Sequence, residues 1–273
     1  MPARSRTAEP STPAAPAHGD DRLFIGSVAK CFRVLELLNA SDGPLGLVEI
    51  ARQSGLGKSA AQRATHTLRE LGYLRQHPDT RAYALSSKML DFTHTVLAQD
   101  RVRSVAMPAL EALNRHCGET VNLTRLEGEE VVYVARFPSM HAVSVDLHIG
   151  SRLPAFCTSP GRAMLSRMPA EDARRILDAS RRIARTPHTE TGLRRILDIL
   201  QETRRRGYAV NDQESHVGDV SIAAAIVDGA GRVAGAINIA APSPRWTIVS
   251  LQRRFSGELM WTATEVSKAI GVL

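Results

Sequence analysis

Apolar residues near the start of the chain repeat first at helical spacing and then at strand spacing. Two helices are predicted at about Leu47–Ser54 and from Lys58 to Gly72, with Gly55 as a turn residue between them. Short strands at 73–75 and 81–85 flank a Pro-Asp turn, which predicts a β-hairpin. A further helix is predicted to begin near Ser27, a residue type that caps helices, because apolar residues recur behind it at Val28, Cys31, Phe32, Leu35 and Leu38. Three helices followed by a hairpin predict a winged helix-turn-helix domain over residues 25–86.

The pattern changes after this domain. Residues 87–116 read as helical with a break near Pro108, and we interpret 87–104 as a linker helix. Antiparallel strands with flanking helices then predict an α+β effector domain over residues 105–273. The strands are predicted at Thr120–Arg125, Glu130–Ala135, Val143–Leu147, Val220–Val227 and Val233–Ile239. The helices are predicted after Ser159, at 170–184, at 192–206 and at 247–270.

Residues 1–24 differ in composition from the rest of the chain. They are rich in Pro, Ala, Ser and Thr, which predicts a disordered tail. No apolar block follows Arg4 and Arg6, so the segment is not typical of a secretory signal. No apolar run reaches the roughly 18 residues of a membrane span. We therefore expect a cytoplasmic protein that does not contact a membrane.

The net charge permits a polyanionic partner without locating it. The chain carries a formal charge of +7. Residues 25–87 hold eight basic and five acidic side chains, whereas residues 170–206 hold ten and six. Charge alone would point to the second half of the chain, so the prediction of DNA binding depends on the residue pattern.

The predicted third helix has one apolar and one polar face. Ala60, Ala64, Leu68 and Leu71 are expected to pack. On the exposed face Gln can bond adenine, Arg can bond guanine or phosphate, and Lys and Ser can hold phosphate. A solvated helix face is the alternative, but the Gly-bearing turn before the helix and the hairpin after it favour DNA contact. The expected contacts are Lys58, Ser59, Ala61, Gln62, Arg63 and His66 of the helix, with Arg75 and Arg81 of the wing.

No set of residues in the sequence is typical of catalysis. His116-Cys117 and the acidic pair Asp212 and Glu214 lack a third orienting partner at a telling spacing. Cys31, Cys117 and Cys157 suit neither a zinc site nor a disulfide framework, and we interpret them as reduced, buried thiols. The sequence predicts no metal, no cofactor and no enzyme. An enzyme whose N-terminal helices only mediate assembly, and a nucleic-acid-binding scaffold without a ligand, are the alternatives.

Two features of the second half could bind a carboxylate. The loop from Arg152 to Gly161 leads into a helix whose first backbone N–H groups can bind an anionic oxygen. Arg136, at the end of a predicted strand, can grip a carboxylate through two parallel hydrogen bonds. An ordinary capped helix start and a surface ion pair are the respective alternatives.

Blocks of sequence throughout residues 25–271 resemble one family. In the first half the blocks are Ser27-Val28-Ala29-Lys30, Glu49-Ile50-Ala51, Gly55-Leu56-Gly57-Lys58-Ser59 and Leu71-Gly72-Tyr73-Leu74. In the second half they are Gly118-Glu119-Thr120-Val121, Val131-Val132-Tyr133, Gly150-Ser151-Arg152-Leu153-Pro154, Gly161-Arg162-Ala163, Arg206-Gly207-Tyr208 and Ile222-Ala223-Ala224-Ala225-Ile226. In this order they resemble the IclR family of transcriptional regulators. The segment Tyr133-Val134-Ala135-Arg136 resembles the matching segment in the branch of the family that controls aromatic-acid breakdown.

The resemblance implies a fold and a pocket. The fold is α+β, with an N-terminal winged helix-turn-helix domain, a linker helix and a C-terminal GAF-like antiparallel-sheet effector domain. One wall of the effector pocket is implied at Ser159, Pro160 and Gly161. The other implied pocket residues are Asn211, Asp212, Asp219, Ser221, Asn238 and Ala240. The chain departs from the usual family residues at Pro160, Asn211, Ser221 and Ala225.

These interpretations combine into one expected function. The chain is expected to regulate transcription by binding double-stranded operator DNA under the control of a small organic acid, with an aromatic acid favoured. An apolar stripe at Met89, Phe92, Val96 and Leu97 predicts a homodimer, with a homotetramer left open. Packing of the stripe on its own domain is the alternative. The sequence leaves open the identity of the acid, the operator sequence and the direction of regulation.

Overall fold

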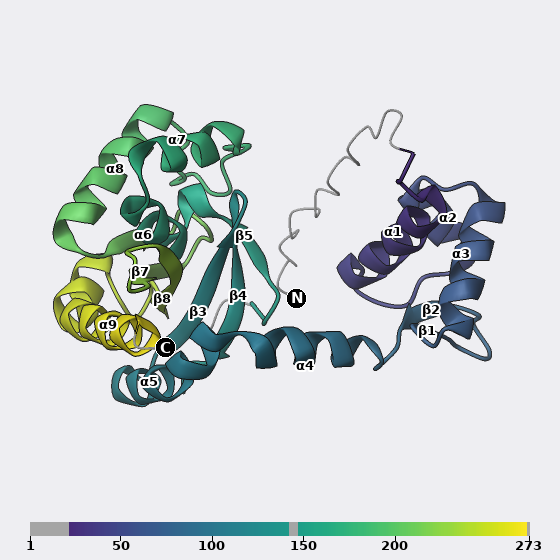
Figure 1. Ribbon diagram of the computed structural model, residues 1–273, viewed down its shortest axis with the longest axis horizontal. Helices are drawn as coiled ribbons and strands as arrows, with labels where there is room; N and C mark the ends of the chain where they lie inside the picture. The colour runs from purple at the N-terminus through teal and green to yellow at the C-terminus, as the bar shows by residue number, and fades with distance from the viewer. Residues whose placement is uncertain (1–21, 142–146, 272–273) are drawn as a thin grey trace. The chain divides into compact units, whose positions relative to one another are not determined.

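The computed structural model describes residues 22–141 and 147–271. Most of the predicted tail and most of the predicted strand at 143–147 lie outside the described residues. The chain divides into two compact units, one ending at Val96 and the other beginning at Leu97 (Figure 1). The predicted linker at 87–104 contains this division. Within the described part, no helix is both long and apolar enough to cross a membrane.

The N-terminal unit has the order of elements expected of a winged helix-turn-helix domain. Its elements are α1 (Gly26–Ala40), α2 (Leu47–Ser54), α3 (Lys58–Glu70), β1 (Leu74–Gln76), β2 (Tyr83–Leu85) and most of α4 (Met89–Gln99), which continues past the division. Strands β1 and β2 pair antiparallel, and Leu45 bridges to Tyr83 beside them. Val34 and Ile50 are fully buried in the core that joins the first three helices. The predicted winged domain is confirmed.

The packing face of α3 differs from the predicted one by a small rotation of the helix. Ala61, Ala64, Thr65 and Leu68 are buried, whereas Leu71 is exposed. The residues i, i+3, i+4 and i+7 of a helix share a face, so this set is self-consistent. Ala61 is fully buried in the core, and its side chain cannot contact DNA as we expected. The prediction for Ala61 is therefore wrong.

The helical break lies at Asp100, and not near Pro108. Helix α5 (Arg101–Cys117) contains Pro108 on an exposed position without interruption. Asp100 caps this helix, because its carboxylate accepts a hydrogen bond from the Arg103 backbone N–H at 3.0 Å. The same carboxylate pairs with Arg125 at 3.1 Å. A good cap and an ion pair make Asp100 the point where the chain starts a new helix.

The C-terminal unit is built on one antiparallel sheet. Its strands are β3 (Thr120–Glu127), β4 (Glu130–Phe137), β5 (Arg152–Pro154), β6 (Ala209–Asp212), β7 (Asp219–Val227) and β8 (Val233–Pro242), in the spatial order β5-β4-β3-β8-β7-β6. The predicted α+β class is confirmed. Strands β5 and β6 are short and lie at the two edges of the sheet, which explains why periodicity did not reveal them.

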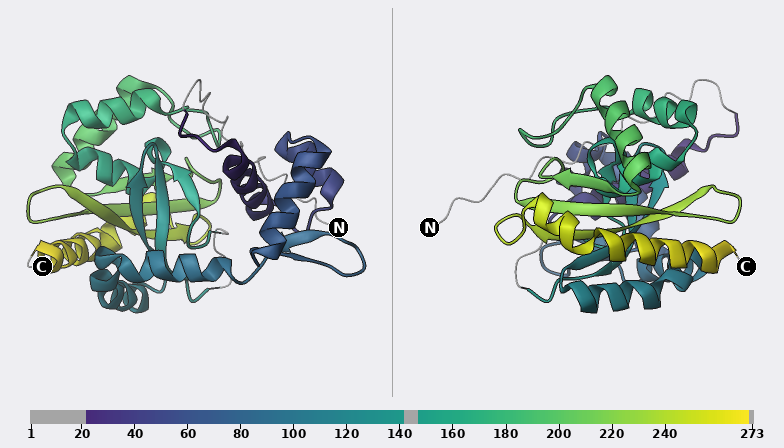
Figure 2. Two further views of the ribbon diagram at one scale, coloured as in Figure 1. Left: turned by 45° about the vertical axis from the view of Figure 1, so that its right-hand side comes forward. Right: turned by 90° about the vertical axis from the view of Figure 1, so that its left-hand side faces the viewer.

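Helices cover both faces of this sheet (Figure 2). Helices α5 and α9 (Ile248–Gly271) pack on one face, over a core that includes Val121 and Ile237. The opposite face is covered by α6 (Ser159–Arg167), α7 (Ala170–Ala179) and α8 (Leu193–Arg206), over a core that includes Tyr133 and Met164. Alternate residues of the central strands therefore enter two different cores.

Helix α6 approaches the short 3₁₀ helix η1 (Ala155–Cys157) closely at Gly161. A Cβ atom added at Gly161 would lie 2.2 Å from the Ala155 carbonyl oxygen and 2.4 Å from its Cα atom. Contacts this short would force the backbone of η1 or α6 to move. Gly161 is therefore required for packing, and it is not among the residues that line the cavity described below.

We predict that Gly161→Ala lowers the free energy of unfolding of the C-terminal unit by about 1–3 kcal/mol or more, because the added methyl overpacks α6 against η1. Trp246 and Trp261 both lie in this unit, so tryptophan fluorescence during urea unfolding reports on it. Gly257→Ala in α9 is the control, because nothing lies within 4 Å of its added Cβ. That control should raise stability by about 0.5–1 kcal/mol. Equal unfolding midpoints for the two variants would contradict the packing role of Gly161.

Candidate functional site

The exposed face of α3 carries the side chains expected to contact DNA. Helix α2 ends at Gly55, which is left-handed with a φ of 66°, and this permits the tight turn into α3. Helix α3 begins after Gly57, so its first N–H groups and its positive dipole end are available to a phosphate. Every expected helix contact other than Ala61 is exposed: Lys58, Ser59, Gln62, Arg63 and His66.

The wing presents the other two expected contacts, Arg75 on β1 and Arg81 in the turn, and both are exposed. Arg81 has a left-handed backbone with a φ of 58°. Its N–H donates to the His77 carbonyl at 3.0 Å, and its own carbonyl accepts from Gln76 at 2.8 Å. Gln76 also accepts from Arg69 of α3 at 3.2 Å. Hydrogen bonds thus join the wing to α3, and the wing carries two cationic side chains on its surface.

A cavity of about 370 Å³ lies in the C-terminal unit between the sheet and the start of α6. It contains most of the predicted pocket residues: Arg136, Ser159, Pro160, Asp219, Ser221, Asn238 and Ala240. Its lining also includes residues that we did not predict, among them Thr120, Asn122, Tyr133, Leu153, Thr158, His216 and Val217. Three predicted residues, Gly161, Asn211 and Asp212, are not part of the lining.

A row of polar side chains crosses three neighbouring strands at the cavity. Asn122 of β3 is opposite Arg136 of β4 on one side and Asn238 of β8 on the other. Arg136 donates to the Asn122 side-chain oxygen at 3.2 Å, and Asn122 donates to Asn238 at 3.3 Å. The signal for Asn122 in the sequence is that Thr120, Asn122 and Thr124 alternate with the apolar Val121 and Leu123, which places the three polar side chains on one face of the strand.

A β-bulge in β4 determines which way Arg136 points. The pairing of β3 with β4 shifts between Leu123 and Thr124, so Val134 has no partner of its own. Tyr133 and Arg136 are three residues apart and would face opposite sides of a regular strand. The extra residue at the bulge brings both side chains to the cavity face.

The start of α6 meets the sheet through serine side chains. Ser159 and Ser221 are both buried, and their hydroxyl oxygens are 2.8 Å apart. The backbone contributes less than we expected: Pro160 has no N–H, and the Gly161 N–H already donates to the Thr158 side chain at 3.3 Å. Side chains therefore provide most of the polar groups in this wall.

The cavity holds ionisable groups in a desolvated environment. Asp219 is only 8% exposed, and burial raises its pKa to about 7, against the opposing effect of the Arg136 guanidinium. Burial also raises the pKa of Tyr133, and the nearby Asp219 charge adds to this, so its hydroxyl stays protonated. Among the described lining residues, these two groups, Arg136 and His216 are the ionisable ones.

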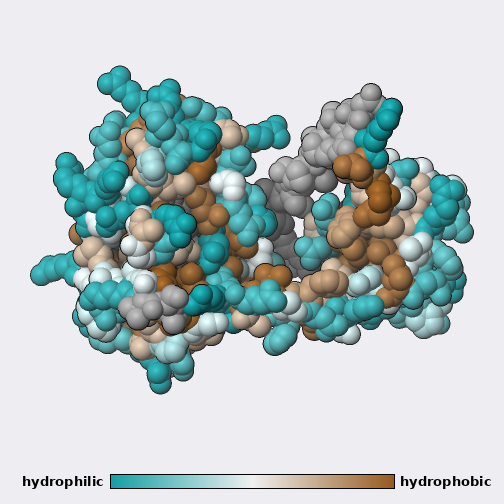
Figure 3. Space-filling view, viewed as in Figure 1, coloured by the Kyte–Doolittle hydropathy of each residue, from teal (hydrophilic) through white to brown (hydrophobic). Residues whose placement is uncertain are grey.

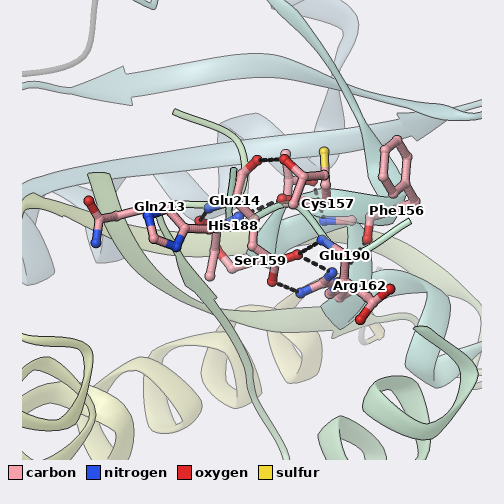
Figure 4. Close-up of polar contacts among 12 residues, drawn as sticks. Phe156, Cys157, Ser159, Arg162, His188, Glu190, Gln213 and Glu214 are labelled. Atoms are coloured by element: carbon pink, nitrogen blue, oxygen red, sulfur yellow. Dashed lines mark hydrogen bonds and ion pairs between the residues drawn. The ribbon is translucent and has the colours of Figure 1, made fainter. Parts of the chain in front are cut away.

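A buried ion pair involves α6, the helix whose first residues line the cavity, and Figure 4 shows its polar contacts. Arg162 of α6 is 1% exposed and bonds both carboxylate oxygens of Glu214, one of them at 2.7 Å. It also donates to the Phe156 carbonyl at 2.8 Å, and Glu214 accepts from the Glu190 N–H at 2.9 Å. The pair joins α6 to the segment that precedes β7.

Asn211 and Asp212 have other positions than predicted. Asn211 is fully buried, donates to the Cys157 carbonyl, and accepts from the Glu214 N–H at 3.2 Å. It therefore fixes backbone segments and does not reach the cavity. Asp212 is exposed, because strand alternation turns it away from Asn211.

The residues considered for catalysis or metal binding are dispersed. His116 contacts Glu258 at 3.0 Å. Cys117 and Cys157 are buried free thiols, and burial raises the pKa of Cys117 to about 11 and that of Cys157 to about 12. Within the residues that the structure describes, no group of three or more His, Cys, Asp or Glu side chains could hold a metal ion.

Comparison with known proteins identifies both units. Residues 27–78 match the IclR helix-turn-helix domain, and residues 94–268 match the bacterial transcriptional regulator IclR C-terminal domain. The chain is 33% identical over 233 residues to the Pca regulon regulatory protein of Pseudomonas putida, covering 85% of this chain and 79% of the relative. It is 29% identical over 220 residues to the p-hydroxybenzoate hydroxylase transcriptional activator of Acinetobacter baylyi, covering 79% and 80% of the two chains.

A solved structure has the same fold. It is an IclR homolog from Microbacterium hydrocarbonoxydans complexed with 4-hydroxybenzoate, and it matches with a TM-score of 0.75 at 23% identity over 90% of this chain and 100% of the other. The named relatives are regulators of transcription, and the two domain matches cover nearly the whole described chain. The protein therefore belongs to the IclR family of DNA-binding bacterial transcriptional regulators.

Proposed function

We propose that this regulator senses a small organic acid, with a hydroxylated aromatic carboxylate as the favoured class, and that the acid controls operator binding. The observation that carries the proposal is Arg136, which the Asn122 side chain holds at the wall of a partly enclosed cavity. Guanidinium groups bind carboxylates through paired, charge-assisted hydrogen bonds. A buried carboxylate without such a partner would be strongly disfavoured.

The remaining lining suits a hydroxylated, planar ligand. Ser221 and Asn238 can bond a ring hydroxyl, and Leu153, Pro160 and Val217 supply apolar surface. A cavity of about 370 Å³ falls in the size range of small-ligand sites, roughly 300–1,000 Å³. The p-hydroxybenzoate named in one relative and the 4-hydroxybenzoate bound in a structural neighbour support the aromatic class.

The exposed face of α3 is proposed to read the operator. Gln62 and Arg63 are the base contacts, because their side chains can form two hydrogen bonds to adenine and guanine. Lys58, Ser59 and His66 of α3, and Arg75 and Arg81 of the wing, are proposed to contact phosphates or base edges.

We propose that the chain acts as a homodimer at least. The exposed large apolar side chains of the N-terminal unit include Val28, Phe32, Leu90, Phe92 and Val96, and Figure 3 shows apolar surface on this unit. Such surface is typical of a protein interface. Two recognition helices can read an inverted repeat. A ligand that binds two dimer geometries unequally shifts the balance between DNA-binding and non-binding states.

Arg63→Ala is expected to weaken binding to an operator selected from random DNA by the wild-type protein by about 10- to 100-fold, with nonspecific binding retained. Arg81→Ala should weaken binding to all sequences alike and reduce the slope of log affinity against log salt by about 0.9. Both are measured by fluorescence anisotropy over a salt series. Unchanged operator affinity of Arg63→Ala at moderate salt would contradict the assignment of base contact.

Arg136→Ala is expected to weaken binding of a benzoate-type acid by about 10- to 150-fold, because a hydrogen bond to a charged group contributes about 1.5–3 kcal/mol. Binding of the matching uncharged amide should change far less. Calorimetry on a panel of hydroxylated benzoates, with 4-hydroxybenzoate and 4-hydroxybenzamide as the first pair, measures this. Arg152→Ala, which removes an exposed Arg paired with Glu127, is the control and should bind as the wild type does. Equal loss for acid and amide would show that Arg136 does not bind the carboxylate.

Val96→Glu is expected to shift the full chain from dimers toward monomers and to weaken operator binding, because it places a charge on the exposed apolar face of α4. Ala98→Glu lies two residues further on, about 200° around the helix, and should stay dimeric. Light scattering measures the mass of each variant. A wild-type protein that is monomeric with and without operator DNA would exclude the proposed dimer.

A further inference from the structure

Among the cavity residues that the structure describes, Asp219 is the one whose negative charge would oppose an acidic ligand. It starts β7, lines the cavity and is only 8% exposed. Its backbone N–H donates to the His216 carbonyl at 3.3 Å, and its carbonyl accepts from Gln213 at 2.9 Å. Among the described residues, no hydrogen bond is found to its carboxyl oxygens. The carboxyl group thus faces the cavity without a protein donor.

The charged groups around Asp219 are few. Arg136 and Tyr133 approach from β4, and His216 from the segment before β7. Arg162 neutralises Glu214 in that segment, and Arg245 neutralises Glu119 behind Pro244. Asp212 on the neighbouring strand is exposed to solvent. Among the described residues, Arg136 and Asp219 are therefore the main charged groups of the cavity lining.

An acid bound at Arg136 would bring a second negative charge into this cavity. Two carboxylates sharing a desolvated site cannot both stay ionised without a large cost, and one of them takes up a proton. The alternative, in which Asp219 stays ionised, leaves Arg136 to neutralise two anions. A protonated Asp219 also gains a donor that can bond the ligand, which a carboxylate lacks.

We propose that Asp219 takes up a proton when the cavity binds an organic acid, so that Asp219 selects the charge of the ligand and makes effector binding depend on pH. This proposal rests on the proposed function of the cavity. It assigns to Asp219 the role of a specificity determinant.

The direction in which acid affinity depends on pH follows from the ionisation of Asp219 in the ligand-free protein. Burial raises the pKa of Asp219 to about 7. Below that pH the carboxyl group already carries its proton, and the affinity for an acid is constant. Above it, binding must bring a proton, and the affinity falls by up to tenfold per pH unit. His216 does not supply this dependence, because burial and Arg185 lower its pKa.

The test is calorimetry with 4-hydroxybenzoate and 4-hydroxybenzamide from about pH 6 to about pH 8.5, in two buffers of different ionisation enthalpy. The wild-type protein should lose acid affinity above about pH 7 by up to tenfold per unit and take up about one proton per ligand at the highest pH. The amide should show neither effect. Asp219→Asn should bind the acid with the low-pH affinity of the wild type at every pH. Asp212→Asn, an exposed change on the adjacent strand, should keep the wild-type dependence.

The outcomes separate this proposal from the proposed function. If no acid of the panel binds the wild-type protein, the proposed function is wrong, and the coupling is wrong with it. If the acid binds with an affinity that does not change with pH, only the role of Asp219 is overturned. The same holds if Asp219→Asn weakens hydroxylated acids more than benzoate, since Asp219 would then accept a hydrogen bond from the ligand as a carboxylate.

A measurement without ligand tests the ionisation itself. A carboxyl group whose pKa is higher in the folded than in the unfolded protein destabilises the fold as it ionises. The wild-type protein should therefore lose stability relative to Asp219→Asn as the pH rises from about 4 to about 7, with no further loss above that. Thermal unfolding measured by tryptophan fluorescence follows this difference. A difference that is constant across the range would overturn the proposal.

Discussion

The buried ion pair between Arg162 and Glu214 is the contact that the shape of the cavity depends on. Arg162 fixes the start of α6, which brings Ser159 and Pro160 to the cavity. Glu214 fixes the segment from which the opposite wall continues into Asp219. Removing one partner would leave an uncompensated buried charge, which costs about 3–5 kcal/mol in comparable pairs. The ion pair thereby fixes the distance between two cavity walls whose residues are far apart in the sequence.

Polar groups in the middle of a covered sheet give this cavity its chemistry. Central strands buried on both faces normally carry apolar residues, because an unpaired polar group there is costly. Asn122 and Asn238 are satisfied by each other and by Arg136, so they hold the guanidinium at the cavity wall. Asp219 has no such partner among the described residues. Among the described residues, the lining thus combines the Arg136 guanidinium with a titratable carboxyl group.

The strand that carries Arg136 is also joined to the helix that follows the division of the chain. Arg103 of α5 donates to the carbonyl of Val134, the bulged residue of β4, at 3.0 Å. The neighbouring Asp100 caps α5 and pairs with Arg125 of β3. A ligand that displaces Arg136 therefore acts on a strand bonded to the start of α5. Control of DNA binding further requires that the ligand bind two geometries with different affinity.

The sequence alone determined the order of most elements, the winged domain and the α+β class, because periodicity, caps and turn residues are local signals. Several cavity residues followed from the resemblance to the family. Tertiary structure decided the rest. Ala61 is buried since the other helices, and not α3 itself, select the face of α3 that packs. The bulge at Val134, the contact of Gly161 with Ala155 and the burial of Asp219 each depend on a segment distant in sequence or on the fold around it. No local sequence pattern encodes such contacts. These contacts determine which polar side chains line the cavity.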